Sequence, residues 1–199
     1  MLRHRPQALR RGWRLLPQLV HDPVEHTRIV TVMAHLLDDL GQPDAAMVAF
    51  DHLLEGMPTD HPGAFAMHVQ RAILFFHHDR LADGDDTLRK LRNTVDRYEG
   101  TPLGAAYHVA RLVQSVKTHH FAEGVEDVTD PVTTFRPLGV ESGYGHALLA
   151  LCLRHTGRFT EADDAWRRAT LLLPADTLTR RFPELDAMRT PPDMPGDPA

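Results

Sequence analysis

The sequence predicts an all-α protein built from antiparallel helix pairs. Proline and glycine punctuate the chain at helix-length intervals, apolar residues recur between them at helical spacing, and no segment alternates apolar and polar residues as a strand would. The chain has 199 residues, of which 42% are hydrophobic and 25% are charged. This composition supports a real hydrophobic core and excludes a disordered, collagen-like or disulfide-stapled chain.

The first helix pair is marked by four punctuating residues and a capping box. Asp22 is an N-cap residue, Pro23 takes the first helical position, and Glu25 completes the box. Gly41 supplies the left-handed residue that ends this helix, and Pro43 opens the next one. Apolar residues follow both starts at helical spacing: Ile29, Val30, Met33, Leu36, Leu37 and Leu40, then Ala46, Met47, Phe50, Leu53 and Leu54.

Two more pairs are predicted in the middle of the chain. Pro62 begins one helix, and Leu88, Leu91 and Val95 mark its partner. Pro102 begins another helix, whose partner is expected to be short or broken. Apolar residues line the two leading helices: Ala66, Val69, Ile73 and Phe76 in one, and Ala106, Ala110, Val113 and Val116 in the other.

An irregular insertion is predicted at residues 128–141. Pro131, Pro137 and Gly139 forbid a long helix in this stretch. Phe135 gives the stretch an apolar side chain to bury, so we expect an ordered loop that rests on the helices.

The clearest pattern lies between Tyr144 and Pro174. Small and large residues surround a glycine turn at fixed distances: Leu149, Ala150, Leu153, Gly157, Phe159, Ala162, Trp166 and Ala169. This pattern, over residues 142–175, resembles the tetratricopeptide repeat, a 34-residue helix pair. Residues 27–58 give a second match: Met33, Ala34, Leu37, Gly41, Ala46, Phe50 and Pro58.

The resemblance implies a tetratricopeptide-like right-handed α-solenoid of about four units. The solenoid would occupy residues 22–189, between a basic arm at residues 1–21 and a tail at residues 190–199 that is expected to be disordered. A helix over residues 176–189 is expected to cover its last apolar face. The side chains expected to be buried between paired helices are Phe50, Leu153 and Trp166.

The repeat length predicts where extra residues lie. Gly41 and Gly157 are 116 residues apart, which exceeds three 34-residue periods by 14 residues. We therefore expect two degenerate units between the two glycines and place the excess in residues 128–141.

For function, the resemblance implies a non-enzymatic scaffold that binds a peptide or another subunit. Binding would occur on the concave surface formed by the first helices of successive units. The residues expected to face this surface are Arg28, Thr31, His35, Asp38, His108, Arg111, Ser115, Tyr144, Leu151 and Arg154. Three of them are arginines and one is acidic, so the partner is expected to carry carboxylates. Pairing of these arginines with acids of neighbouring helices is the competing interpretation.

No catalytic residue, cofactor or metal site is predicted. Cys152 is expected to pack as an apolar residue, and no phosphate-binding glycine loop or nucleophile elbow occurs. The alternative function is a metal-binding or catalytic protein, because stacking could align several histidines in a row of ligands. In the competing interpretation, each of these histidines lies near a helix C-terminus and complements the helix dipole there. The histidines are His77, His78, His119, His120 and His155.

The basic arm has five arginines and no acidic residue: Arg3, Arg5, Arg10, Arg11 and Arg14. Its apolar residues share one face of a short helix: Leu9, Trp13, Leu16 and Val20. We favour docking of this face on the first helix pair, because that contact leaves the arginines in water. Nucleic-acid contact is a further alternative, whereas so short an apolar face is a weak membrane anchor.

Net charge, cysteine count and hydropathy limit the partners and the location of the chain. The net charge of -5 gives no general attraction for nucleic acid or an anionic membrane. One cysteine cannot form an internal disulfide, and no run of 18 apolar residues occurs. We expect a cytoplasmic protein, and its arginine-rich composition, with 20 arginines and 2 lysines, is typical of a high-GC bacterial genome.

Overall fold

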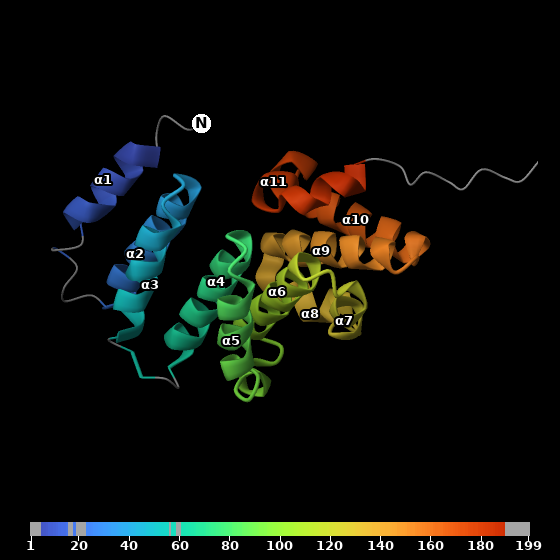
Figure 1. Cartoon of the computed structure of the whole chain (residues 1–199), viewed down its shortest axis with the longest axis horizontal. Helices are drawn as coiled ribbons and strands as arrows, with labels where there is room; N and C mark the ends of the chain where they lie inside the picture. The colour runs from blue at the N-terminus through green and yellow to red at the C-terminus, as the bar shows by residue number, and fades with distance from the viewer. Residues whose placement is uncertain (1–4, 16–17, 19–22, 56, 59–60, 190–199) are drawn as a thin grey trace, which may run out of the picture. The chain divides into compact units, whose positions relative to one another are not determined.

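The structure, a computed structural model, describes residues 5–15, 18, 23–55, 57–58 and 61–189 (Figure 1). Within these residues the only regular elements are helices, which confirms the all-α prediction. None of the described helices is long and apolar enough to cross a membrane. The chain divides into two compact units, an N-terminal unit of residues 1–93 and a C-terminal unit of residues 94–199.

The N-terminal unit contains five described helices. Those helices that were expected to begin at a proline do so, because proline needs no hydrogen-bond acceptor in the first turn. Within the unit, α1 packs on α2, α2 on α3, α3 on α4, and α4 on α5. The helices are α1 (Arg5–Leu15), α2 (Pro23–Asp39), α3 (Pro43–Glu55), α4 (Pro62–His77) and α5 (Leu81–Leu91).

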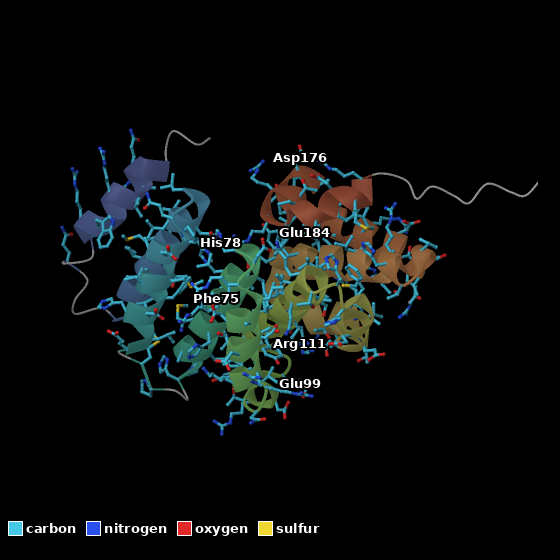
Figure 2. The ribbon with its side chains drawn as sticks, in the orientation of Figure 1. Phe75, His78, Glu99, Arg111, Asp176 and Glu184 are labelled. Atoms are coloured by element: carbon cyan, nitrogen blue, oxygen red, sulfur yellow. The ribbon has the colours of Figure 1, made fainter. Side chains whose placement is uncertain are left out.

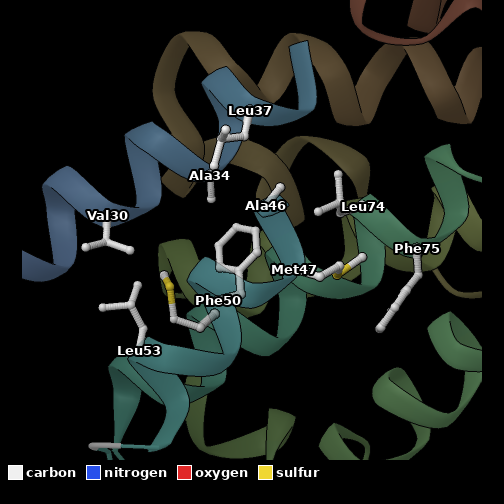
Figure 3. Close-up of a cluster of buried hydrophobic side chains, with 10 residues drawn as sticks. Val30, Ala34, Leu37, Ala46, Met47, Phe50, Leu53, Leu74 and Phe75 are labelled. Atoms are coloured by element: carbon white, nitrogen blue, oxygen red, sulfur yellow. The ribbon is translucent and has the colours of Figure 1, made fainter. Parts of the chain in front are cut away.

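The core of the N-terminal unit is centred on Phe50, whose ring lies between α2 and α3 (Figure 3). Phe50 is 1% exposed, as predicted. Ala34 on α2 and Ala46 on α3 are fully buried, and their small side chains let the two helices approach closely. Further apolar side chains complete the cluster: Val30, Leu37, Met47, Leu53, Met67, Leu74 and Phe75.

The C-terminal unit is built around α9. This helix packs against α10, α6 and α7, and eleven of its fourteen residues are buried. Its described elements are η3 (Val95–Tyr98), α6 (Pro102–Lys117), α7 (Phe121–Glu126), α8 (Pro131–Phe135), η4 (Arg136–Glu141), α9 (Ser142–His155), α10 (Phe159–Leu172), α11 (Ala175–Arg181) and η5 (Pro183–Arg189). Val95, expected in the partner of α4, therefore lies in η3.

Residues 128–141, predicted as an irregular insertion, form two short helical segments, α8 and η4. Phe135 is fully buried, and its ring meets the edge of His146 with 5.3 Å between centroids. A Cβ atom at Gly145 would lie only 2.7 Å from the Phe135 ring, so the glycine makes room for it. Phe135 therefore anchors the stretch to the other helices of its unit.

Two expectations about the end of the chain require correction. The single helix expected over residues 176–189 is interrupted at Phe182, which is extended (φ -131°, ψ 91°) because proline follows it. Leu153 is buried as predicted, but Trp166 is only partly buried. The residues of α10 that are buried are three alanines, so the helices approach through small side chains and the indole lies beside the contact.

The first helix of each pair ends in the same left-handed turn. In these four turns the residues with positive φ are Gly41 (73°), Asp79 (55°), His119 (60°) and Gly157 (77°), at intervals of 38, 40 and 38 residues. The next amide in each turn donates to the carbonyl five residues earlier at 2.9 Å: Gln42 to Leu37, Arg80 to Phe75, His120 to Ser115, and Arg158 to Leu153. The three intervals exceed the 34-residue period by 4, 6 and 4 residues. The prediction that residues 128–141 hold the whole excess of 14 is therefore wrong, because the extra residues are spread over all three intervals.

Replacing Phe50 with alanine should lower the free energy of unfolding by about 3–5 kcal/mol, because it removes a fully buried ring and leaves a cavity. Urea unfolding followed by circular dichroism measures this change. Val48→Ala on the same helix is the matched control, since Val48 is 67% exposed and its loss should cost at most about 0.5 kcal/mol. Equal effects of the two substitutions would contradict the described packing of α3.

Candidate functional site

An open apolar groove lies between α1, α2 and α3 in the N-terminal unit. Its volume is about 580 Å³, and only two of its lining residues are polar. We call it the α1–α3 groove. It is lined by Leu9 and Trp13 of α1, by Val30, Met33 and Leu37 of α2, and by Gln42, Ala45, Val48, Ala49 and His52 at the start of α3 and along it.

The groove exists because α1 touches α2 along a narrow line. Gly12 faces Met33 so closely that a Cβ atom on the glycine would lie 2.6 Å from the Met33 sulfur. Leu9 packs against the Phe50 cluster, but Trp13, one turn further on, is 58% exposed. The indole therefore stands at the edge of the groove and does not fill it.

A smaller gap of about 270 Å³ lies on the other side of α1, next to Arg11, Leu15 and Val32. Val32 is 53% exposed. The α1 helix thus rests on α2 with apolar surface open on both sides. Docking of the arm on the first helix pair agrees with the prediction, although Trp13 is not covered, and Leu16, Val20 and Arg3 lie outside the described residues.

The predicted concave-surface residues of the N-terminal unit contact other helices of that unit. Thr31 donates a hydrogen bond to the Met67 sulfur at 3.4 Å, and His35 meets the edge of the Phe50 ring at 6.0 Å between centroids. Asp38 lies 2.5 Å from Nε2 of His78. The side chain of Arg28 lies outside the described residues.

Arg111, labelled in Figure 2, is held by its own unit. Its Nε and Nη2 atoms both lie 2.8 Å from Asp127 Oδ2, and Nη1 donates to Gln114 Oε1 at 2.5 Å. This pairing agrees with the competing interpretation, in which the arginines pair with acids of neighbouring helices. The guanidinium is therefore already paired with a carboxylate of its own unit.

The remaining predicted residues of the C-terminal unit are also occupied or buried. Arg154 donates to the Ala187 carbonyl at 2.9 Å, and Tyr144 meets the edge of Phe182. Ser115 and Leu151 are each 2% exposed, and His108 is half-buried. The role of these residues in partner binding stays a prediction.

The histidines expected to form a row have other neighbours. The His155 ring stacks on Phe121 at 4.0 Å, and His119 meets the edge of the same ring at 5.7 Å. Across the residues that the structure describes, no three His, Cys, Asp or Glu side chains form a group that could hold a metal ion. Cys152 is fully buried, and burial raises the pKa of its thiol to about 12.

A different set of histidines recurs at one position of the helix pairs. His68, His108 and His146 each lie eleven residues before a left-handed turn residue. Burial lowers the pKa of all three imidazoles. In the described part of the chain, the buried Nδ1 atoms of His108 and His146 have no hydrogen-bond partner. Of this set, only His108 was among the predicted site residues, although a His-Val-x-Arg motif begins at residues 68 and 108.

The stability of the protein should fall as the pH drops below about 6.5. Each of these imidazoles has a folded-state pKa below the ordinary value of 6.5, so the unfolded chain binds more protons between the two values. Their contribution is fully present above pH 6.5 and is lost as the pH falls through the folded-state pKa. Urea unfolding at several pH values between about 7.5 and 5 measures this slope.

His146→Leu should flatten the slope, because it removes one of the buried imidazoles. Val132→Leu is the matched control, since Val132 is exposed on α8 and the substitution removes no titratable group, so the slope should stay unchanged. A slope that His146→Leu does not alter would show that this imidazole is not neutral and buried in the folded state.

We compared the chain with protein-family models, with curated proteins and with solved structures, and none of the three comparisons gives a match. The resemblance to tetratricopeptide repeats therefore stays a prediction.

Proposed function

We propose that this chain is a non-enzymatic scaffold that binds a partner protein in the α1–α3 groove. The observation that carries the proposal is the open apolar groove with Trp13 at its edge. Its volume of about 580 Å³ falls in the range of binding sites, and its lining is apolar with a few polar groups, as in such sites. Exposed apolar surface of this kind marks interaction sites, and tryptophan is enriched among the residues that dominate binding energy.

The groove is a better candidate than the concave-surface residues first predicted. Arg111 and Arg154 already donate hydrogen bonds within their own unit. A partner that captured them would first have to break those contacts. Trp13 and Val48 are 58% and 67% exposed, so a partner can bury them without displacing part of the fold.

A tetratricopeptide-like solenoid is part of the proposal. Four identical left-handed turns at nearly constant intervals support a repeat of helix pairs. The intervals of 38–40 residues are longer than the 34 residues of the family. Buried small residues follow each turn at the same distance, as close packing within a pair requires: Ala46, Gly84, Gly124 and Ala162.

A cytoplasmic location completes the proposal. The chain has one cysteine, which is reduced and buried on α9. This cysteine usage suits a reducing compartment.

Val48→Glu should abolish capture of the partner, because a charge in the apolar groove opposes burial of an apolar face. The wild-type chain and the variant are immobilised and exposed to a lysate of the source cells, and the retained proteins are identified by mass spectrometry. Val132→Glu is the matched control, since Val132 is 48% exposed and lies on α8, outside the groove.

The expected result is one protein retained by the wild type and by Val132→Glu but lost with Val48→Glu. Unfolding curves of all three chains should coincide within about 0.5 kcal/mol, because both valines are exposed. A partner retained equally by all three chains binds elsewhere and would refute the groove as the binding site.

A further inference from the structure

The two edges of the α1–α3 groove carry opposite charges. On α1, Arg10 and Arg14 share the outer side of the helix, which faces away from α2; Arg10 is next to Trp13 around the helix, and Arg14 lies one turn after Arg10. On α3, Asp44 and Glu55 lie four residues before and seven residues after Val48, and therefore on the same edge as that valine. We call the first two residues the basic rim and the last two the acidic rim.

The rim charges are exposed, and no ion pair engages any of the four within the part of the chain that the structure describes. The neighbouring acid Asp51 differs, because it lies 3.1 Å from Arg71 of α4 and belongs to the packing of the unit. The helix α1 contains no acidic residue that could pair with its arginines. The rims are therefore available to charges on a partner.

The shape of the groove suits a helix. Its lining runs from Gln42 to His52, ten residues further along α3, which corresponds to about 15 Å at 1.5 Å per residue. This length matches about three turns of a second helix. Amphipathic helices bind in such grooves by presenting apolar residues at positions i, i+3, i+4 and i+7.

We propose that the α1–α3 groove binds an amphipathic helix of a partner protein that carries acidic residues on one flank and basic residues on the other. This inference rests on the proposed function and adds the chemistry of the partner. The acidic flank faces Arg10 and Arg14, and the basic flank faces Asp44 and Glu55. Opposite flank charges also fix the direction in which the helix lies, because a reversed helix would place like charges together.

Charge disfavours the other occupants of an apolar groove. The α1 helix of a second copy has an apolar stripe but is purely basic, so its arginines would repel the basic rim. An anionic membrane would attract the basic rim but would repel Asp44 and Glu55 at the opposite edge. A helix with two differently charged flanks is the occupant that satisfies both rims.

Three synthetic peptides of about four helical turns test the proposal on the full-length chain. All share one apolar face, and their flanks are acidic and basic, acidic on both sides, or basic on both sides. Isothermal titration calorimetry at low salt measures each dissociation constant. The wild-type chain should bind the mixed peptide about tenfold more tightly than either uniform peptide, because each uniform peptide meets one rim of like charge.

Charge reversal of one rim should change which peptide binds best. The double variant Arg10→Glu with Arg14→Glu has two acidic rims and should prefer the basic peptide. Asp44→Lys with Glu55→Lys has two basic rims and should prefer the acidic peptide. As matched control, Arg89→Glu with Lys90→Glu reverses two exposed charges on α5 and should keep the preference of the wild type.

The outcomes separate the inference from the proposed function. If Val48→Glu abolishes binding of every peptide but the rim reversals leave the order of affinities unchanged, the groove binds helices and the proposed charge pattern is wrong. If no peptide binds the wild-type chain, or Val48→Glu has no effect, helix binding in the groove is refuted as well. Binding to phosphatidylglycerol vesicles that is lost with the Arg10→Glu, Arg14→Glu variant and is not displaced by the mixed peptide would identify a membrane surface as the occupant and overturn the inference.

Discussion

The left-handed turn between paired helices is the constraint on which the rest of the structure depends. The turn reverses the direction of the chain within a few residues, so the second helix must lie close against the first. A small residue occupies the close approach, and at Gly84 a Cβ atom would lie 2.5 Å from the Phe76 ring. Two of the four turn residues are glycine, whereas Asp79 and His119 adopt positive φ at the cost that side chains incur there. That cost of about 1–2 kcal/mol is tolerable because the helix pair behind each turn buries a large apolar surface.

The same constraint explains why the candidate site lies at α1. Each pair closed by a left-handed turn brings its helices together through small residues: Ala46, Gly84, Gly124 and Ala162. By contrast, α1 approaches α2 closely at Gly12, and its Leu9 packs against the Phe50 cluster. A helix held along one line leaves an apolar gap on either side, and the larger gap is bounded by α3. The binding surface is thus a consequence of incomplete packing at one end of the unit.

Local signals in the sequence were sufficient for the helices but not for their surfaces. Proline at positions 43, 62 and 102 and glycine at 41 and 157 act through their own backbone preferences, so the predicted boundaries were accurate. Asp79 and His119 take the same conformation without the glycine that would reveal it. Whether Arg111 meets a partner or Asp127 depends on the fold of residues 119–127, which no local pattern specifies. The groove was missed for the same reason, since its existence depends on how closely α1 approaches α2.

The arginines of the basic rim differ from exposed arginines elsewhere in this arginine-rich chain. Several exposed arginines of this protein pair with an acid three residues away, as in the pairs of Arg80 with Asp83, Arg158 with Glu161 and Arg167 with Asp164. Such pairs satisfy the guanidinium locally, and each adds little to stability. The α1 helix departs from this pattern, because its arginines stand on a helix with no acid at all. Charges that the fold neither pairs nor needs for stability contribute chiefly to the rate and specificity of association. Their position beside an open apolar groove therefore fits selection of a partner better than support of the fold.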